Sequence, residues 1–154
     1  MTDATDARPV LHRSPFADLT PAQLYAVLRL RSEIFVVEQE GVYQDLDDHD
    51  ADAAMIHLWH EAGGQIVSVA RMFETTDDAG RPVGRIGRIG TSKAARGQGL
   101  ARELVQAAID HFAPKPVILA AQSYLEAYYA SFGFVVDGER FDEHGIAHTP
   151  MRRD

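Results

Sequence analysis

The feature that most constrains the fold is a strand–turn–helix segment in the middle of this 154-residue chain. A strand-like run over residues 83–92 leads into the glycine-rich turn of residues 96–99, RGQG. A helix follows at once, because apolar residues recur three and four positions apart until Pro114 stops the pattern. The short apolar run 117–121 is typical of a buried parallel strand. This order of elements predicts an α/β fold.

Periodicity and turn residues predict the other elements. Thr20 is a good N-cap with Pro21 as the first helical residue, and apolar residues then recur at helical spacing until Gly41. The Gly63-Gly64 pair is typical of a β-hairpin. We further expect a strand at 10–13, a helix at 21–37, strands at 55–61 and 65–73, a short helix at 124–132, and strands at 134–141 and 146–152. The length fits one domain over 1–154, with 1–8 as a loose tail.

The composition excludes several classes of protein. The chain has no cysteine, which excludes disulfides, Cys-ligated zinc, Fe–S clusters and thiolate nucleophiles and makes a cytoplasmic location the simpler expectation. No apolar run approaches the roughly 20 residues of a membrane span. Because the N-terminus is polar, we expect it to be neither a signal nor a transit peptide. His57 and His60 would point to opposite faces of a strand, so we expect no metal site.

The net charge of −8 argues against a nucleic-acid partner, but the charge is unevenly distributed. Residues 79–102 hold six basic residues and no acidic one, so this stretch carries +6 and the rest of the chain −14. The basic stretch is either a solvated edge or the surroundings of an anion site. Residues 37–52, in contrast, hold seven acidic residues and no lysine or arginine. This acidic run is either a solvated loop or a surface that attracts a cationic substrate.

The glycine-rich turn has the features of an anion site. Gly87 and Gly90 interrupt a strand, which is typical of a bulge or of close approach by a ligand. The turn then directs backbone N–H groups outward at the positive end of the helix dipole, where glycine leaves room for a phosphate. The sequence has no Walker A motif, and no G-x-G-x-x-G opens an early Rossmann unit. An ordinary helix start would, however, have the same local pattern.

Three motifs in order resemble the GNAT superfamily of N-acetyltransferases. Arg96-x-x-Gly99-x-Ala101 matches the family's R/Q-x-x-G-x-G/A signature, after a strand with internal glycines and before an amphipathic helix. Residues 122–134 resemble the second motif, in which a helix that carries a tyrosine ends in Gly-Phe. The segments LRLRSEIFVVEQ (28–39), YQDLDDHD (43–50) and GIAHTPM (145–151) are similar to the ElaA-like subgroup. The resemblance covers nearly the whole chain from about Phe16.

The resemblance implies both a fold and a co-substrate. The GNAT fold is a mixed, mostly antiparallel sheet, splayed at the centre, with helices on both faces. The implied reaction is acetyl transfer from acetyl-CoA to an amine. Backbone amides of the turn would hold the pyrophosphate, and the bulged strand would lie beside the pantetheine. The implied binding residues are Ile89, Gly90, Thr91, Arg96, Gly97, Gln98, Gly99, Leu100, Ala101 and Gln122.

The resemblance also implies how the protons move. Tyr129, four residues before Gly133, corresponds to the tyrosine that protonates the departing thiolate, while we assign Tyr128 to the core. A backbone N–H near Gly90 and Thr91 is the expected oxyanion donor.

The general base is not fixed by the motifs. Many relatives carry a glutamate on the bulged strand, where this chain has Arg88. Glu38 is the first candidate, because it ends the helix signature that borders the substrate side in the family. His57, Glu74 and His148 are the other candidates. Since the chain lacks cysteine, direct attack by the amine is favoured over a covalent acetyl-cysteine.

The expected function is therefore transfer of an acetyl group to a primary amine, carried by a small molecule or a peptide. One alternative keeps the chemistry but uses a longer acyl-CoA. A second is a catalytically silent module that binds acyl-CoA or a partner, and the missing strand carboxylate keeps that alternative open. The sequence specifies neither the acceptor amine nor the oligomeric state.

Overall fold

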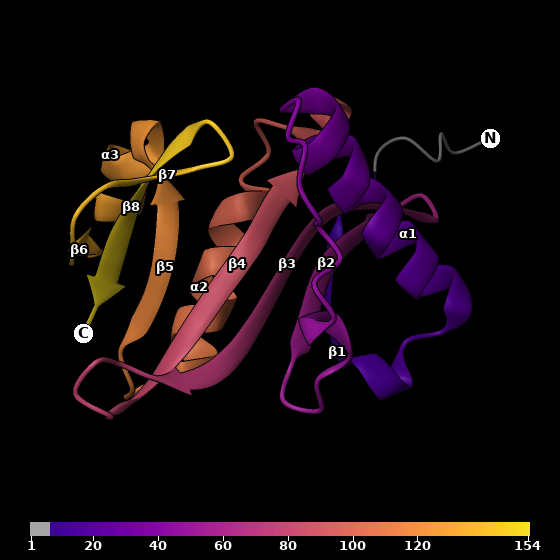
Figure 1. The fold of residues 1–154 in the computed structure, drawn as a ribbon. Coiled ribbons are helices and arrows are strands. Elements are labelled where there is room, and N and C mark those ends of the chain that lie inside the picture. The colour runs from indigo at the N-terminus through magenta and orange to yellow at the C-terminus, as the bar shows by residue number, and fades with distance from the viewer. Residues whose placement is uncertain (1–6) are drawn as a thin grey trace. The chain divides into compact units, whose positions relative to one another are not determined.

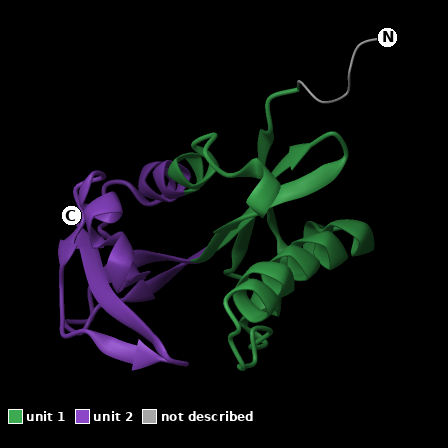
Figure 2. Ribbon diagram, turned by 90° about the horizontal axis from the view of Figure 1, so that it is seen from above, with its two compact units in different colours: residues 1–71, 88–104 green, residues 72–87, 105–154 purple. Residues whose placement is uncertain are grey.

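The computed structural model describes residues 7–154, so most of the tail expected at 1–8 lies outside the described residues. The chain forms two compact units (Figure 2). Unit 1 comprises residues 1–71 and 88–104, and unit 2 comprises residues 72–87 and 105–154. The expectation of one domain over 1–154 stays a prediction.

Within residues 7–154, eight strands form one hydrogen-bonded sheet in the order β1-β2-β3-β4-β5-β8-β6, and β7 pairs with β8 (Figure 1). The pairs β1–β2, β5–β8, β6–β8 and β7–β8 are antiparallel, whereas β4 and β5 run parallel. The sheet is thus mixed, as predicted. The strands are β1 Val10–Pro15, β2 Ile56–Ala62, β3 Gln65–Thr76, β4 Pro82–Thr91, β5 Val117–Gln122, β6 Val135–Val136, β7 Phe141–Glu143 and β8 Ile146–Arg153.

The helices are α1 Pro21–Arg31, a π-helix η2 Ser32–Glu38, α2 Leu100–Phe112 and α3 Glu126–Ala130. Short 3-10 turns occur at η1 Phe16–Asp18, η3 His49–Ala51, η4 Lys93–Ala95 and η5 Ser123–Leu125. None of the helices described between residues 7 and 154 has the length and apolar character needed to cross a membrane.

In unit 1, α1 begins where the sequence predicts. The Thr20 hydroxyl accepts from the Gln23 amide at 3.1 Å, and the Gln23 side chain accepts from the Thr20 amide at 2.9 Å. These two hydrogen bonds satisfy backbone amides at the start of the helix, for which the helix itself supplies no acceptor. The apolar residues of α1 and η2 pack in one core with the sheet; its buried members are Val27, Leu30, Ile34, Phe35, Trp59 and Val69.

The helix predicted over 21–37 is correct in extent but not in type. It is an α-helix only as far as Arg31 and then widens into the π-helix. In a π-helix each amide donates to the carbonyl five residues earlier, as the Gln39 amide does to the Ile34 carbonyl at 3.1 Å. Gly41 ends the segment as predicted. A Cβ there would lie 2.5 Å from the Phe35 carbonyl oxygen, so only glycine fits.

In unit 2, the last two turns of α2 pack on the first part of β4. A Cβ at Gly84 would lie 2.1 Å from Cδ2 of Phe112, so the ring occupies the space that a side chain would need. Here β4 pairs with β5 at two positions, Gly84 with Val117 and Arg85 with Ile118. The parallel strand predicted over 117–121 is therefore confirmed.

The strand predicted over 134–141 is wrong, because it is divided into β6 and β7. The division has a physical cause in Pro150 of the partner strand β8. The Pro150 carbonyl accepts from the Asp137 amide at 2.8 Å, so the nitrogen of Pro150 faces the same side. That nitrogen has no hydrogen to donate, and the ladder is interrupted there. The helix predicted over 124–132 is also shorter, with only α3 being α-helical.

Candidate functional site

The turn between β4 and α2 is built around two glycines with positive φ. Gly97 has φ 84° and Gly99 has φ 77°, a region that other residues rarely adopt. A Cβ added at either glycine would meet no atom within 4 Å, so the space beside the backbone is open. Because an α-helix leaves its first N–H groups without an intrahelical acceptor, the amides at the start of α2 can bind an anion here. The residues therefore fit a pyrophosphate group.

The predicted anion-binding Arg96 is already bound to a carboxylate. Its Nε donates to the Thr91 carbonyl at 3.1 Å, and a terminal nitrogen lies 2.6 Å from a carboxylate oxygen of Glu38. The side chains are 43% and 37% exposed, so water screens the pair and limits its contribution to about 1 kcal/mol. The candidate base and the candidate anion ligand thus meet in one ion pair.

Within β4 the positive φ lies at Arg88, at 52°, and not at the neighbouring glycines. Gly87 has open space where its Cβ would be. A Cβ at Gly90 would lie 2.9 Å from Cδ1 of Ile34 and 3.2 Å from Cζ of Phe35. The groups that approach Gly90 are thus side chains of η2, whereas the predicted approach of a ligand stays a prediction.

The acidic run 37–52 is not a solvated loop at three of its positions. Asp45 and Asp50 are 3% and 7% exposed, and Asp47 is partly buried. Three arginines bind them in these pairs: Arg31 with Asp45 and Asp50, Arg71 with Asp47 and Asp50, and Arg88 with Asp45 and Asp47. These aspartates are consequently not available to attract a cationic substrate. Arg88 also belongs to the basic stretch, so the charge separation seen along the sequence is partly cancelled in space.

The arginines keep the carboxylates of Asp47 and Asp50 ionised. Hydrogen bonds from Arg71 hold the pKa of Asp47 well below its usual range. Burial alone would raise the pKa of Asp50, but hydrogen bonds from Arg31 and Arg71 outweigh it and the net shift is downward. At neutral pH Asp47 and Asp50 are therefore ionised, and both are weak bases.

Tyr129, the predicted general acid, lies on α3 in unit 2 and is 6% exposed. Its ring meets those of Tyr128 and Phe134 edge-on, with centroids 5.2 and 6.2 Å apart. Burial raises the pKa of its hydroxyl, and the neighbouring Tyr128 and Tyr124 add to the shift. The phenol is therefore protonated at neutral pH, as a general acid must be. The assignment of Tyr128 to the core is wrong, because Tyr128 is only half-buried and Tyr129 is the buried ring.

Two of the other candidate bases have structural partners. His57 is 1% exposed and its Nε2 donates to the Asp50 carbonyl at 2.9 Å, which supports the loop that carries the acidic cluster. Burial lowers the pKa of His57, so the ring is neutral at pH 7. Glu74, in unit 2, is paired with Lys115 at 2.7 Å.

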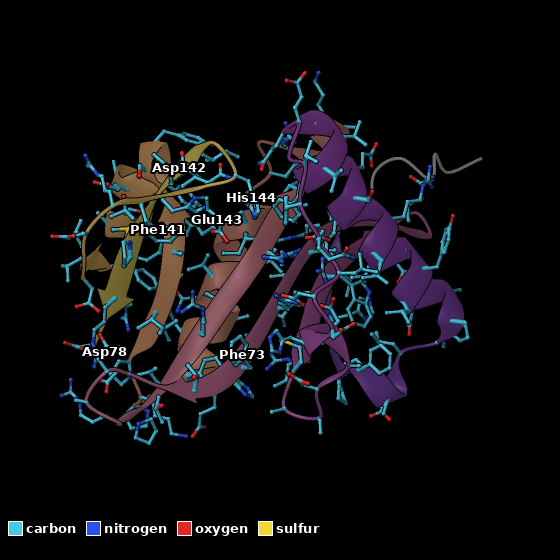
Figure 3. All side chains as sticks on the ribbon, in the orientation of Figure 1. Phe73, Asp78, Phe141, Asp142, Glu143 and His144 are labelled. Atoms are coloured by element: carbon cyan, nitrogen blue, oxygen red, sulfur yellow. The ribbon has the colours of Figure 1, made fainter. Side chains whose placement is uncertain are left out.

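The third, His148, lies on β8 beside the β7–β8 hairpin. Its Nδ1 donates to the Ile146 carbonyl at 2.9 Å, and its ring stacks on Phe141 at 5.6 Å between centroids. The carboxylate of Glu143 lies 3.9 Å from Nε2 of His148. Glu143 is in the β7–β8 hairpin, next to His144 (Figure 3). The predicted binding residue Gln122 pairs with His148 in the β5–β8 register. The roles assigned to all these residues stay predictions.

Sequence reasoning missed a buried network that anchors the first turn of α2 in unit 1. His60 is fully buried, with Nδ1 2.5 Å from the Ser68 hydroxyl and Nε2 2.6 Å from the Glu103 carboxylate. Arg8 binds the other carboxylate oxygen at 2.7 Å. Hydrogen bonds from Arg8 and His60 lower the pKa of Glu103. The signal that the sequence offered for this network was Glu103, an acidic residue in the first turn of α2. No local pattern in the sequence pairs Glu103 with His60.

A bulged strand that leads through a glycine-rich turn into a helix, within a mixed sheet, defines a class of acyl-CoA-dependent acyltransferases. The family described as acetyltransferase (GNAT) domain matches residues 18–154, and the chain belongs to this family. The GNAT fold predicted from the sequence is confirmed. The family uses acyl-CoA as the acyl donor.

The relatives confirm the ElaA-like subgroup. Protein ElaA of Escherichia coli is 38% identical over 148 residues, 94% of each chain, and its crystal structure has a TM-score of 0.83 over 96% of this chain and 100% of its own. A UPF0039 protein of Mycobacterium tuberculosis is 43% identical over 137 residues, 88% of this chain and 87% of its own. An acyl-CoA N-acyltransferase from Pseudomonas aeruginosa has a TM-score of 0.85 at 40% identity, over 96% of this chain and 100% of its own.

Proposed function

We propose that the chain is an N-acetyltransferase that moves the acetyl group of acetyl-CoA to a primary amine by direct attack. The observation that carries the proposal is the open turn at Gly97 and Gly99, which leaves backbone amides beside the start of α2 accessible to a pyrophosphate. The family, whose members use acyl-CoA, supports the same choice of donor. The N-acyltransferase activity in the name of the Pseudomonas aeruginosa protein agrees with it.

Binding of the donor is assigned mainly to backbone groups of unit 1. The amides of residues 96–101 would hold the pyrophosphate, and the backbone of Ile89, Gly90 and Thr91 would lie along the pantetheine. An N–H near Gly90 would donate to the carbonyl oxygen as negative charge develops on it. Because these contacts use amides, they do not depend on the side chain of Arg96, which is occupied by Glu38.

The proton transfers require one base and one acid. The acceptor must lose a proton from its ammonium form, so that a neutral nitrogen attacks the thioester carbon. As the carbon–sulfur bond breaks, the thiolate takes the proton of the Tyr129 hydroxyl, which burial keeps protonated at neutral pH. Glu38 is the proposed base. It can accept a proton directly or through water once Arg96 no longer holds its carboxylate.

The acceptor is a primary amine on a small molecule or a peptide. The acidic run had favoured a cationic acceptor, but three of its aspartates are neutralised by arginines. A positive charge on the acceptor beyond the reacting amine is therefore not part of the proposal. A longer acyl group stays an alternative to acetyl.

The test is release of free thiol from acetyl-CoA by the purified protein over a panel of primary amines. We expect amine-dependent thiol release, and thermal stabilisation by CoA alone. The same assay with propionyl-CoA and longer acyl-CoAs defines the acyl group. Absence of thiol release with every amine and every donor would contradict the proposal.

A silent acyl-CoA-binding module is the second candidate. It is favoured by the arginine at position 88, where many relatives carry a carboxylate, and by the ion pair that holds Glu38. Thermal stabilisation by CoA without amine-dependent thiol release would support this candidate over the enzyme.

A further inference from the structure

Arg88 has a backbone conformation that its residue type does not favour. Its φ of 52° lies in the left-handed region, which costs a residue with a Cβ and which glycine adopts freely. Positions 87 and 90 are glycines, yet the positive φ falls on the arginine. A strained non-glycine residue in the middle of a strand persists when its surroundings hold it there.

The groups that hold Arg88 come from the loop 43–47, in the same unit. Its Nε lies 2.8 Å from Oδ1 of Asp45, and a terminal nitrogen donates to the Asp45 carbonyl at 3.2 Å. Its guanidinium also lies over the ring of Tyr43, 5.7 Å from the centroid. These contacts fix the side chain, and through it the backbone of β4, to the loop.

The loop is itself anchored without Arg88. Arg31, which is 1% exposed, donates to Oδ2 of Asp45 at 3.1 Å and to the Asp45 carbonyl at 3.0 Å. Asp47 is held by Arg71 through two terminal nitrogens. Removal of the Arg88 side chain therefore leaves neither buried carboxylate without an arginine. The contribution of Arg88 lies in the strand that it holds and not in the neutrality of the cluster.

We infer that Arg88 is a positioning residue: its clamp to the 43–47 loop fixes the bulge in β4 and aims the backbone of Ile89, Gly90 and Thr91 at the acyl-pantetheine arm of the donor. The inference rests on the proposed function, because it concerns the strand assigned to that arm. In this role Arg88 shapes the backbone and does not move a proton.

The test compares two ligands that differ in the arm in question. Acetyl-CoA carries the pantetheine, whereas ADP carries only the adenosine and pyrophosphate portion. Both are titrated calorimetrically into the full chain and into Arg88→Ala, Arg88→Gly and Arg88→Lys. Arg85→Ala is the matched control, since it removes the same charge from an exposed position of the same strand.

We expect Arg88→Ala and Arg88→Gly to bind acetyl-CoA about tenfold more weakly, roughly 1.4 kcal/mol. Their affinity for ADP should change less than twofold. Arg88→Lys retains the charge but not the fork, so it should recover part of the loss. Arg85→Ala should match the wild type with both ligands. Hydrogen exchange at the amides of residues 89–91 should be faster in Arg88→Gly than in the wild type.

Three outcomes would overturn the inference. One is an Arg88→Gly variant that binds acetyl-CoA as tightly as the wild type, which would mean that the backbone bulges without the clamp. Another is an equal loss of affinity for ADP, which would indicate lost charge or general loosening. The third is unchanged hydrogen exchange at 89–91. The proposed function would survive all three, whereas a wild-type chain that binds no acetyl-CoA would overturn both.

Discussion

Replacement of Arg31 by methionine should lower the free energy of unfolding at pH 7 by about 3 kcal/mol. Arg31 is buried and donates three charge-assisted hydrogen bonds. They run to the Asp45 carboxylate at 3.1 Å, to the Asp50 carboxylate at 2.6 Å and to the Asp45 carbonyl at 3.0 Å. Breaking a buried ion pair by removing one partner costs roughly 3–5 kcal/mol, because a charge is left buried and uncompensated. The lower end applies here, because Asp45 keeps Arg88 and Asp50 keeps Arg71. Methionine fills a similar volume, so a cavity contributes little.

Urea unfolding, followed by circular dichroism, measures this loss, and a thermal melt should show a midpoint lower by roughly 6–12 °C. The variant Arg31→Met/Asp50→Asn removes one charge of each sign and should recover part of the stability. A double variant no more stable than Arg31→Met would mean that the loss comes from packing.

The dependence on pH gives a second measurement of the same cluster. Because the folded-state pKa of Asp50 is lowered in the wild type, its contribution is present above the unfolded pKa of about 3.9 and is lost as the pH falls through the folded value. In Arg31→Met that pKa rises, although Arg71 still lowers it, so the variant lacks part of this contribution at pH 7. The difference between the two proteins should therefore be largest at pH 7 and smaller at pH 3. A loss below 1 kcal/mol at pH 7, or a difference that grows on acidification, would refute the reasoning.

Three further predictions concern single residues. Tyr129→Phe should lower turnover about 100-fold while acetyl-CoA affinity stays within twofold, because the ring packing is kept and only the proton donor is lost. Steady-state kinetics measures the turnover and calorimetry the affinity. Unchanged turnover at every pH would exclude Tyr129 as the acid. Arg96→Glu should weaken CoA binding about tenfold, measured by calorimetry, because it adds negative charge beside the turn. Lys93→Glu is the control. An equal loss of CoA affinity in both variants would show that only net charge matters. Gly84→Ala should lower the free energy of unfolding by about 3 kcal/mol, measured by urea unfolding, because its Cβ would lie 2.1 Å from the Phe112 ring. A loss below 0.5 kcal/mol would show that α2 shifts freely.

The elements that could be predicted from the sequence are those with local causes. Thr20 caps α1 through a side chain three residues from its partner, so the bond is encoded within one turn. Gly63 and Gly64 both adopt positive φ, which the hairpin requires and which the residue types announce. The glycines of the β4–α2 turn are predictable for the same reason. Each of these signals is complete within a few residues.

The acidic cluster could not be predicted because its partners are distant in sequence. Arg88 lies 43 positions from Asp45. A run of carboxylates without neighbouring arginines looks solvated, and only the tertiary fold supplies the arginines. One signal was available, however. Arg31 occupies an apolar-stripe position of its helix, together with Leu28 and Phe35, and an arginine at such a position needs a buried acidic partner.

The division of the predicted strand 134–141 had a signal of a different kind. Pro150 lies inside β8, and a proline within a sheet removes one hydrogen bond of the ladder. The sequence does not tell which neighbouring strand loses that bond, because the answer depends on the register. The structure shows that the nitrogen faces Asp137, so the interruption falls between β6 and β7 and spares the pairing with β5.

Several basic side chains near the glycine-rich turn are paired with carboxylates, which changes the groups that can bind the anionic donor. Arg88 is held by Asp45, and Arg96 is held by Glu38. Arg81 also pairs with Asp77, at 3.0 Å, so at least three of the six basic side chains are already paired. At Gly97 and Gly99, in contrast, no atom lies within 4 Å of the place of a Cβ, so an anion can approach the backbone there. Anion binding at this turn should consequently depend on backbone geometry first, and the pair of Arg96 with Glu38 should decide mainly when the carboxylate is available as a base.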